Sequence, residues 1–143
     1  MITRATDYAI RILVYMSKKN YGELSTKKEV SERCGIPVSF LAKIVQILSK
    51  NRLINIKKGS QGGYILTKKP EEITLLDVIE LIEGRIFLNH CIKDKEVCEF
   101  YSKCVIHKMW ENLTEKLRAE LRNINFKELA DKDNCFIVEN STS

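Results

Sequence analysis

Three cysteines and a histidine lie close together in the stretch CIKDKEVCEFYSKCVIH, which runs from Cys91 to His107. Thiolate sulfur and imidazole nitrogen are ligands for zinc and for iron–sulfur clusters. The gaps are six residues from Cys91 to Cys98, five from Cys98 to Cys104 and two from Cys104 to His107. Zinc sites usually contain a tighter C-x2-C pair, whereas wide gaps let a loop wrap a larger group. The spacing therefore predicts a bound metal and favours an iron–sulfur cluster, with a zinc site as the alternative.

The two cysteines outside this stretch are not expected to bind metal, and the stretch itself is not expected to be a catalytic site. Cys34 ends a predicted helix and is expected to pack as a small apolar side chain, while Cys135 lies near the C-terminal end and is expected to be exposed. A thiol enzyme built on Cys104 and His107 would also need an orienting group, an oxyanion hole and a pocket. The sequence has no pattern for these features, so we do not expect an enzyme.

Composition and charge indicate a globular protein that contacts a polyanion. The 143 residues are 44% hydrophobic and 30% charged, and the five cysteines are an odd number, which argues against a disulfide framework. No apolar run is long enough to span a membrane, and Asp7 and Arg11 interrupt the only signal-like stretch, so we expect a cytoplasmic protein. Residues 1–70 carry 14 lysines and arginines against four acidic residues, whereas residues 71–143 carry ten against 15. The basic half fits double-stranded DNA.

Three helices are predicted in the basic half. Apolar residues recur at helical spacing over residues 3–18. Thr26 and Glu29 form a capping box that predicts a helix over residues 27–34, and Gly35 allows the left-handed conformation that ends it. The helix that follows has an apolar stripe made of Leu41, Ile44, Val45 and Leu48. Helix, glycine turn and helix form the helix-turn-helix pattern, whose second helix enters the DNA major groove.

A basic hairpin follows this pattern. Two short strands are predicted over residues 53–56 and 64–67, and the sequence KKGSQGG joins them over residues 57–63. A flexible basic hairpin beside a helix-turn-helix is typical of a wing that reaches the minor groove or the phosphates. The residues expected to contact DNA are Ser39, Phe40 and Lys43 on the second helix and Lys58, Gly59, Ser60 and Gln61 on the wing.

The second half of the chain contains a long amphipathic helix. A shorter helix begins near Thr74 and ends at Gly84, and the long one runs from about residue 105 to 123. Its apolar positions are Ile106, Met109, Trp110, Leu113, Leu117, Leu121 and Ile124. This stripe packs either on its own chain or on a second copy. We favour a homodimer, because one short recognition helix reads few bases and usually works on two half-sites.

Over residues 1–131 the chain resembles the Rrf family of bacterial winged-helix regulators. The resemblance rests on TDYAIR, GIPVSFLAKIVQILSKNRLI, KKGSQGGY, DVIELIEG and CVIHKMW, together with the three-cysteine spacing. It implies a homodimeric transcription regulator whose operator binding is controlled by an iron–sulfur cluster that senses iron or cluster supply, redox state or nitric oxide. A zinc-stabilised DNA-binding module without a sensing role remains the alternative.

The resemblance also implies the cluster ligands, and two branches of the family differ in the fourth one. His107 stands where IscR-like members place a histidine on a 2Fe–2S cluster, and Asp7 stands where NsrR-like members place an aspartate that ligates a 4Fe–4S cluster of the other subunit. We favour Cys91, Cys98, Cys104 and His107 with a 2Fe–2S cluster, because this histidine is local. Lys58 replaces a common wing arginine, and Ala42 replaces a polar reader of some members.

The expected fold is mainly α with a small β-hairpin wing, namely a winged helix-turn-helix domain followed by a long C-terminal dimerisation helix. We expect the DNA-binding domain to cover residues 1–84. The cluster-binding loop and the dimerisation helix would cover residues 85–131, and a flexible tail residues 132–143.

Overall fold

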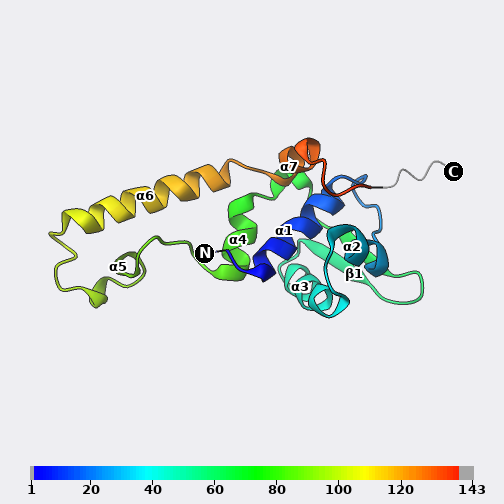
Figure 1. Ribbon diagram of the computed structural model, residues 1–143, viewed down its shortest axis with the longest axis horizontal. Helices are drawn as coiled ribbons and strands as arrows, with labels where there is room; N and C mark the ends of the chain where they lie inside the picture. The colour runs from blue at the N-terminus through cyan, green and yellow to red at the C-terminus, as the bar shows by residue number, and fades with distance from the viewer. Residues whose placement is uncertain (1, 139–143) are drawn as a thin grey trace.

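The computed structural model describes residues 2–138, which form a helical body with one long helix extending from it (Figure 1). In chain order the elements are α1 (Arg4–Ser17), α2 (Lys27–Cys34), α3 (Val38–Lys50), β1 (Ile54–Lys57), β2 (Gly63–Leu66), η1 (Pro70–Glu72), α4 (Leu75–Glu83), α5 (His90–Lys93), η2 (Lys95–Val97), α6 (Val105–Arg122) and α7 (Phe126–Lys132). The prediction of a mainly helical fold with a β-hairpin wing is confirmed.

Helix α1 forms the centre of the body. It packs against α2, α3, α4 and α7, so Ala9, Ile12 and Leu13 have no exposed surface. The apolar spacing that predicts this helix is therefore the spacing of its buried face. Burying three such side chains contributes several kcal/mol to the free energy of folding, at about 25 cal/mol per Å² of apolar surface. The remaining elements are positioned relative to this helix.

The hydrogen bonds that cap the helix ends form as the sequence predicts. The Thr26 hydroxyl accepts a bond from the Glu29 amide, the Glu29 carboxylate accepts one from the Thr26 amide, and Gly35 ends α2 with a φ of 64°. Thr74 and Asp77 form the same reciprocal pair at the start of α4. Each cap satisfies backbone donors that a helix leaves unpaired.

The chain returns to the body after α6. The Leu75 amide donates to the Ile124 carbonyl and the Phe126 amide to the Ile73 carbonyl, so the starts of α4 and α7 are joined. Phe126 is fully buried. The predicted tail begins at residue 132, and its residues 139–143 lie outside the described ones.

The first part of that tail contacts the body. The Lys18 ammonium, at the end of α1, forms an ion pair of 2.7 Å with Asp133 and donates to the Phe136 carbonyl at 2.7 Å. Phe136 packs against the core.

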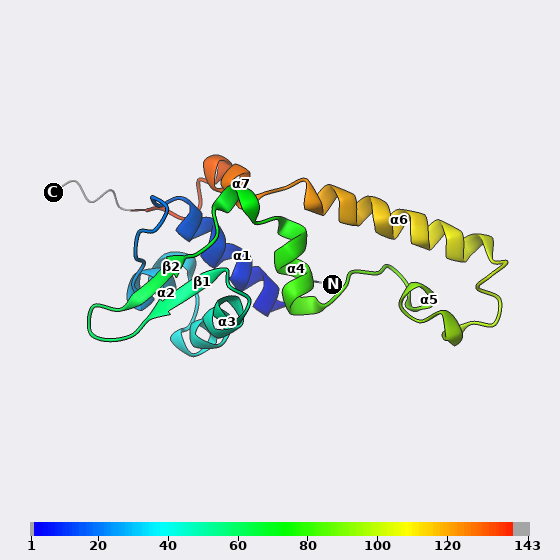
Figure 2. The ribbon, with the colours of Figure 1, turned by 180° about the vertical axis from the view of Figure 1, so that it is seen from behind.

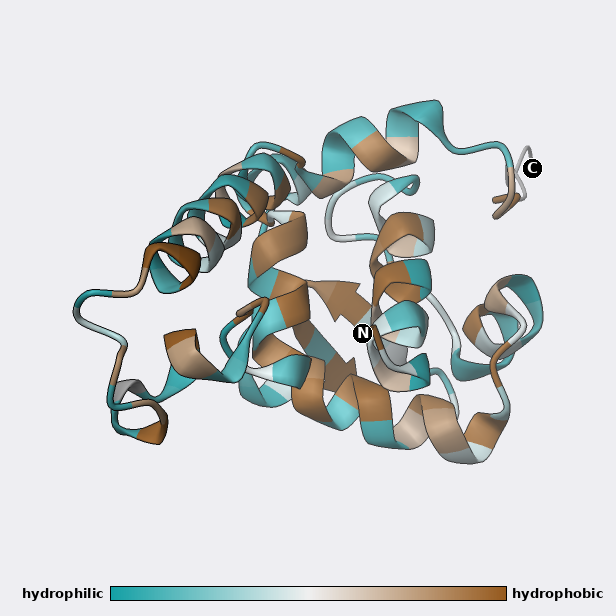
Figure 3. Ribbon diagram, turned by 60° about the vertical axis from the view of Figure 1, so that its left-hand side comes forward, coloured by the Kyte–Doolittle hydropathy of each residue, from teal (hydrophilic) through white to brown (hydrophobic). Residues whose placement is uncertain are grey.

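Helix α6 lies largely outside the body. The segment after α4 leads away to α5, and α6 runs back towards the body, as Figures 1 and 2 both show. Hydrophobic residues recur along α6 in Figure 3, yet only His107 and Thr114 are buried on this helix. Among residues 2–138, no helix combines the length and the apolar character that crossing a membrane requires.

Candidate DNA-binding surface and cysteine segment

The second helix of the helix-turn-helix is fixed by its buried face and by the turn before it. Leu41, Ile44, Val45 and Leu48 are buried, which confirms the predicted stripe. In the turn, the Ser31 hydroxyl donates to the Ile36 carbonyl at 2.6 Å, and the Arg11 guanidinium donates to the Cys34 carbonyl at 3.2 Å. These bonds fix the turn between α2 and α3 and join it to α1. The face of α3 opposite its buried stripe is exposed.

The exposed face of α3 carries the predicted readers. Ser39, Phe40 and Lys43 are all exposed, as are Ala42 and Gln46. Residues 38–50 contain no aspartate or glutamate, so this face repels no phosphate. An exposed face with a hydroxyl, an amide and a cation can donate hydrogen bonds to base edges in the major groove.

The wing is a two-stranded antiparallel hairpin in which Ile54 pairs with Leu66 and Lys57 with Gly63. Its predicted contact residues, Lys58, Gly59, Ser60 and Gln61, are all exposed. Gly59 has a φ of 108°, which side chains rarely adopt. A glycine at this position therefore permits the turn that places Lys58 at the hairpin tip.

A surface hollow lies between α3 and the wing. It is lined by residues of α2, α3 and the hairpin, among them Lys27, Ala42, Gln46, Lys57 and Lys58. Three lysines around one concave surface suit a phosphate backbone. Lys57 belongs to the predicted basic hairpin without being named there as a contact residue, and sequence reasoning missed Lys27. Lys27 is the first residue of a capped helix, where the positive end of the helix dipole also attracts anions.

The four predicted metal ligands lie at the far end of α6 and in the segment before it. Cys91 is in α5, Cys98 follows η2, Cys104 is the N-cap of α6 and His107 is in its first turn. Sequence reasoning treated this segment as a loop and missed α5 and η2. All three cysteines are partly buried and carry free thiols.

The structure brings two of these four residues together. The Cys104 sulfur accepts a hydrogen bond from the His107 amide at 3.4 Å. Within residues 2–138, no three His, Cys, Asp or Glu side chains gather as a metal-binding group. The four predicted ligands are therefore not gathered into one coordination site.

His107 is the one predicted ligand whose side chain is buried. Its exposed fraction is 6%, its ring meets the Tyr101 ring edge-on at 5.8 Å, and its Nδ1 atom is buried without a hydrogen-bond partner. Leaving a buried polar atom unpaired costs about 1–3 kcal/mol. An unpaired imidazole nitrogen in a segment with three thiols offers ligand types that suit zinc or an iron–sulfur cluster.

The alternative ligand, Asp7, has another partner. Its carboxylate forms an ion pair with Arg11 at 2.7 Å on the surface of α1. Two cysteines outside the segment are placed as the sequence predicts. Cys34 is buried, and burial raises the pKa of its thiol to about 12, while Cys135 is exposed.

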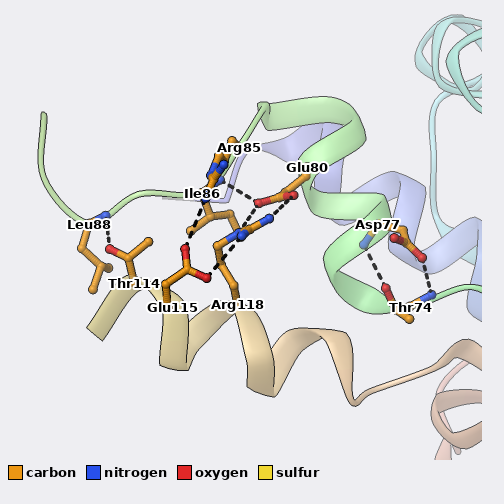
Figure 4. A network of polar contacts seen from close by, with 9 residues as sticks. All are labelled: Thr74, Asp77, Glu80, Arg85, Ile86, Leu88, Thr114, Glu115 and Arg118. Atoms are coloured by element: carbon orange, nitrogen blue, oxygen red, sulfur yellow. Dashed lines mark hydrogen bonds and ion pairs between the residues drawn. The ribbon is translucent and has the colours of Figure 1, made fainter. Parts of the chain in front are cut away.

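Helix α6 is fastened to α4 by a polar network that sequence reasoning missed (Figure 4). The Arg118 guanidinium donates two bonds to the Glu80 carboxylate, at 2.7 and 3.0 Å, and the Leu88 amide donates to the Thr114 hydroxyl at 3.2 Å. The bonds from Arg118 hold the pKa of Glu80 below its usual value. The network also includes Glu115, which pairs with Arg118 at 3.5 Å.

Helix α4 is fastened in turn to α1. The Glu83 carboxylate accepts bonds from the hydroxyl groups of Thr3 and Thr6 and, at 2.9 Å, from the Thr3 amide. These bonds hold the pKa of Glu83 below its usual value. Two carboxylates of one short helix thus join α6 to α1.

A helix-turn-helix with an exposed, basic recognition face and a lysine-bearing wing defines a winged-helix transcription regulator that binds DNA. The chain belongs to the Rrf2 family, whose sequence model, described as an iron-dependent transcriptional regulator, matches residues 2–132.

Individual relatives agree with this assignment. The HTH-type transcriptional regulator IscR of Serratia proteamaculans is 33% identical over 110 residues, which cover 77% of this chain and 66% of that protein, just under two thirds of its length. Two solved structures share the fold. CymR, the global cysteine regulator of B. subtilis, has a TM-score of 0.77 at 22% identity and covers 94% of this chain and 98% of its own. T. potens IscR has a TM-score of 0.70 at 21% identity, with 98% and 93% covered.

Proposed function

We propose that this regulator holds an iron–sulfur cluster through Cys91, Cys98, Cys104 and His107, and that the state of the cluster controls its affinity for operator DNA. The observation that carries the proposal is the buried Nδ1 atom of His107, which has no partner in a segment that supplies three thiols. Ligation of the imidazole would remove the cost of burying the ring with this atom unpaired. The family description and the IscR relative support iron over zinc.

The geometry at the start of α6 suits a charged sulfur ligand. Cys104 is the N-cap residue, and its sulfur already accepts the His107 amide. The positive end of the helix dipole stabilises negative charge at this position. A cluster bound here would supply a group whose oxidation state and integrity respond to iron supply, redox potential or nitric oxide.

We favour a 2Fe–2S cluster with His107 over a 4Fe–4S cluster with Asp7 of a second subunit. The Asp7 carboxylate already forms an ion pair with Arg11 at 2.7 Å, and this positive charge would compete with a cluster for it. His107 has no such competing bond at Nδ1.

We propose that the regulator is a homodimer formed through α6. The apolar residues of this helix are largely exposed, with fractions from 37% at Leu117 to 78% at Val105. The same side of the molecule contains an apolar groove, lined in part by Ile10, Ile79 and Leu121. We infer that a second copy of the chain covers both surfaces. In a two-fold symmetric dimer, the stripe and the groove of each subunit can both contact the other subunit.

The proposed functions follow the predicted boundaries, with DNA binding in residues 1–84 and cluster binding and dimerisation in residues 85–131. Bases would be read from α3 and the phosphate backbone held by the wing. The link between the two functions is α4, because Glu80 bonds to α6 and Glu83 bonds to α1. We place the protein in the cytoplasm, where a bacterial regulator meets its DNA.

The test is anaerobic purification followed by absorption spectroscopy and by iron, sulfide and zinc analysis. We expect a reddish-brown dimer, about twice 16.6 kDa, with iron and sulfide in near-stoichiometric amounts. Substitution of any one of Cys91, Cys98 or Cys104 by Ala should bleach the protein, and His107→Ala should destabilise the cluster more than Asp7→Ala. Cys34→Ala is the matched control, because this cysteine is buried in the core.

Two other outcomes would contradict parts of the proposal. A colourless protein with about one zinc per chain would show a zinc-stabilised module. Loss of the cluster in Asp7→Ala together with an unchanged spectrum in His107→Ala would favour a 4Fe–4S cluster that bridges two chains.

A further inference from the structure

One apolar side chain on the proposed reading face is held in a fixed position. Phe40 lies in the first turn of α3 and is 46% exposed. Its ring contacts the ring of Tyr8 at 5.8 Å, at an interplanar angle of 72°. Tyr8 belongs to α1 and is buried, so it forms a rigid support beneath Phe40.

Cations surround this aromatic pair. The Lys43 ammonium lies 5.9 Å from the centre of the Phe40 ring, and the Arg4 and Arg11 guanidinium groups lie 5.8 and 5.5 Å from that of Tyr8. An exposed ring rarely keeps one position without support. Here the ring packs edge-on against the buried Tyr8, and the exposed part of Phe40 lies near the positive charge of Lys43.

The chemistry of the major groove identifies what such a ring can read. Thymine is the base that presents a methyl group there, and an apolar side chain such as Phe makes contact with it. Other groups on α3 suit other bases: Lys43 can donate to guanine and Gln46 can bond to adenine. Resting on the proposed placement of α3 in the major groove, we infer that Phe40 reads the 5-methyl group of a thymine in each operator half-site.

The expected size of the effect follows from the area of one methyl group. Burying such a group contributes about fourfold in affinity, the equivalent of about 0.8 kcal/mol. A homodimer on two half-sites would lose about 15-fold when both thymine methyl groups are removed, because separate sites contribute independently.

The experiment removes the methyl group from the DNA and the ring from the protein. Anaerobically purified wild-type protein first selects a duplex from a random-sequence library. Each thymine of that duplex is then replaced by deoxyuridine, which keeps base pairing and lacks the methyl group, and dissociation constants are measured by fluorescence anisotropy. We expect one thymine per half-site whose replacement lowers the affinity of the wild type about fourfold and the affinity of Phe40→Ala less than twofold.

Two variants complete the design. Phe40→Leu keeps an apolar contact without the ring, and it should retain part of the sensitivity to deoxyuridine even if Phe40→Ala folds poorly. Tyr21→Ala removes an exposed aromatic ring outside the reading face and should keep the wild-type profile.

Several results would overturn the inference. One is a selected half-site without thymine, and another is a wild-type affinity that no deoxyuridine changes. A loss that is equal in wild type and Phe40→Ala would assign the methyl contact to another side chain. In these cases the duplex is still bound, so the DNA-binding function stands. A selection that enriches no duplex would instead overturn the DNA surface, and the inference with it.

Discussion

The charge pair between Arg118 and Glu80 is expected to carry most of the polar attachment of α6 to α4. Arg118→Met keeps an unbranched apolar stem and removes both bonds to Glu80 (Figure 4). The side chains are only 13% and 22% exposed, so water replaces the missing bonds poorly. Hydrogen bonds to charged groups contribute about 1.5–3 kcal/mol, and among residues 2–138 the variant leaves the Ile86 amide as the close hydrogen-bond donor to Glu80. We expect Arg118→Met to lower the free energy of unfolding by about 2 kcal/mol.

The assay is a double-mutant cycle with Glu80→Gln, measured by urea unfolding at fixed protein concentration, because a dimer's stability depends on concentration. Lys116→Met is the matched control, since it removes an exposed cation of the same helix. The low pKa of Glu80 sets the pH dependence: the stabilisation is fully present above the unfolded pKa, near 4.3, and is lost as the pH falls through the folded pKa. A coupling energy below about 0.5 kcal/mol at pH 7, or one that persists unchanged at acidic pH, would refute the reasoning.

Three further predictions concern the DNA-binding domain. Lys58→Ala should weaken binding to all DNA sequences. It should also reduce the slope of log affinity against log salt concentration by about one for each phosphate that is no longer neutralised. Lys43→Ala should instead change the preference between operator and scrambled duplex, and titrations at several salt concentrations measure both effects. Glu29→Gln should cost about 1–2 kcal/mol in urea unfolding at neutral pH and less as the pH falls through the folded pKa. Burial alone would raise the pKa of this carboxyl, but hydrogen bonds from its partners hold it below its usual value. Gly63→Ala should lower the thermal midpoint, because a Cβ there would lie 2.3 Å from the Ser25 carbonyl oxygen.

The sequence predicts the DNA-binding half well because its signals are local. Thr26 and Glu29 are three residues apart and satisfy each other wherever the helix lies. Gly35 stops α2 through its own backbone conformation. The apolar spacing of α1 and α3 identifies their buried faces, since both faces pack within the same domain.

The cysteine segment and the α4 network could not be predicted in the same way. Residues 91–104 have no apolar period, so the short elements α5 and η2 leave no pattern. Glu80 and Arg118 are 38 residues apart, and Glu83 and Thr3 are 80 apart. In the sequence each of these residues resembles an ordinary surface residue, and only the packing of α4 between α1 and α6 selects these partners.

The hydrogen bonds that join α4 to α6 and to α1 require a particular geometry, and this requirement affects how α6 and α1 influence each other. Arg118 donates to both oxygens of Glu80, a geometry that a shift of one helix past another cannot keep. Glu83 is equally restricted, because a single oxygen accepts from the Thr3 amide and from two hydroxyl groups. Apolar contacts tolerate small slides, whereas such bonds are either made or broken. A movement of α6 would therefore pull on α4 for as long as the Glu80 bonds hold, and α4 would transmit this pull to α1 through the Glu83 bonds. Because α1 supports Phe40 through Tyr8, the reading face of α3 lies at the other end of the same connected set of helices.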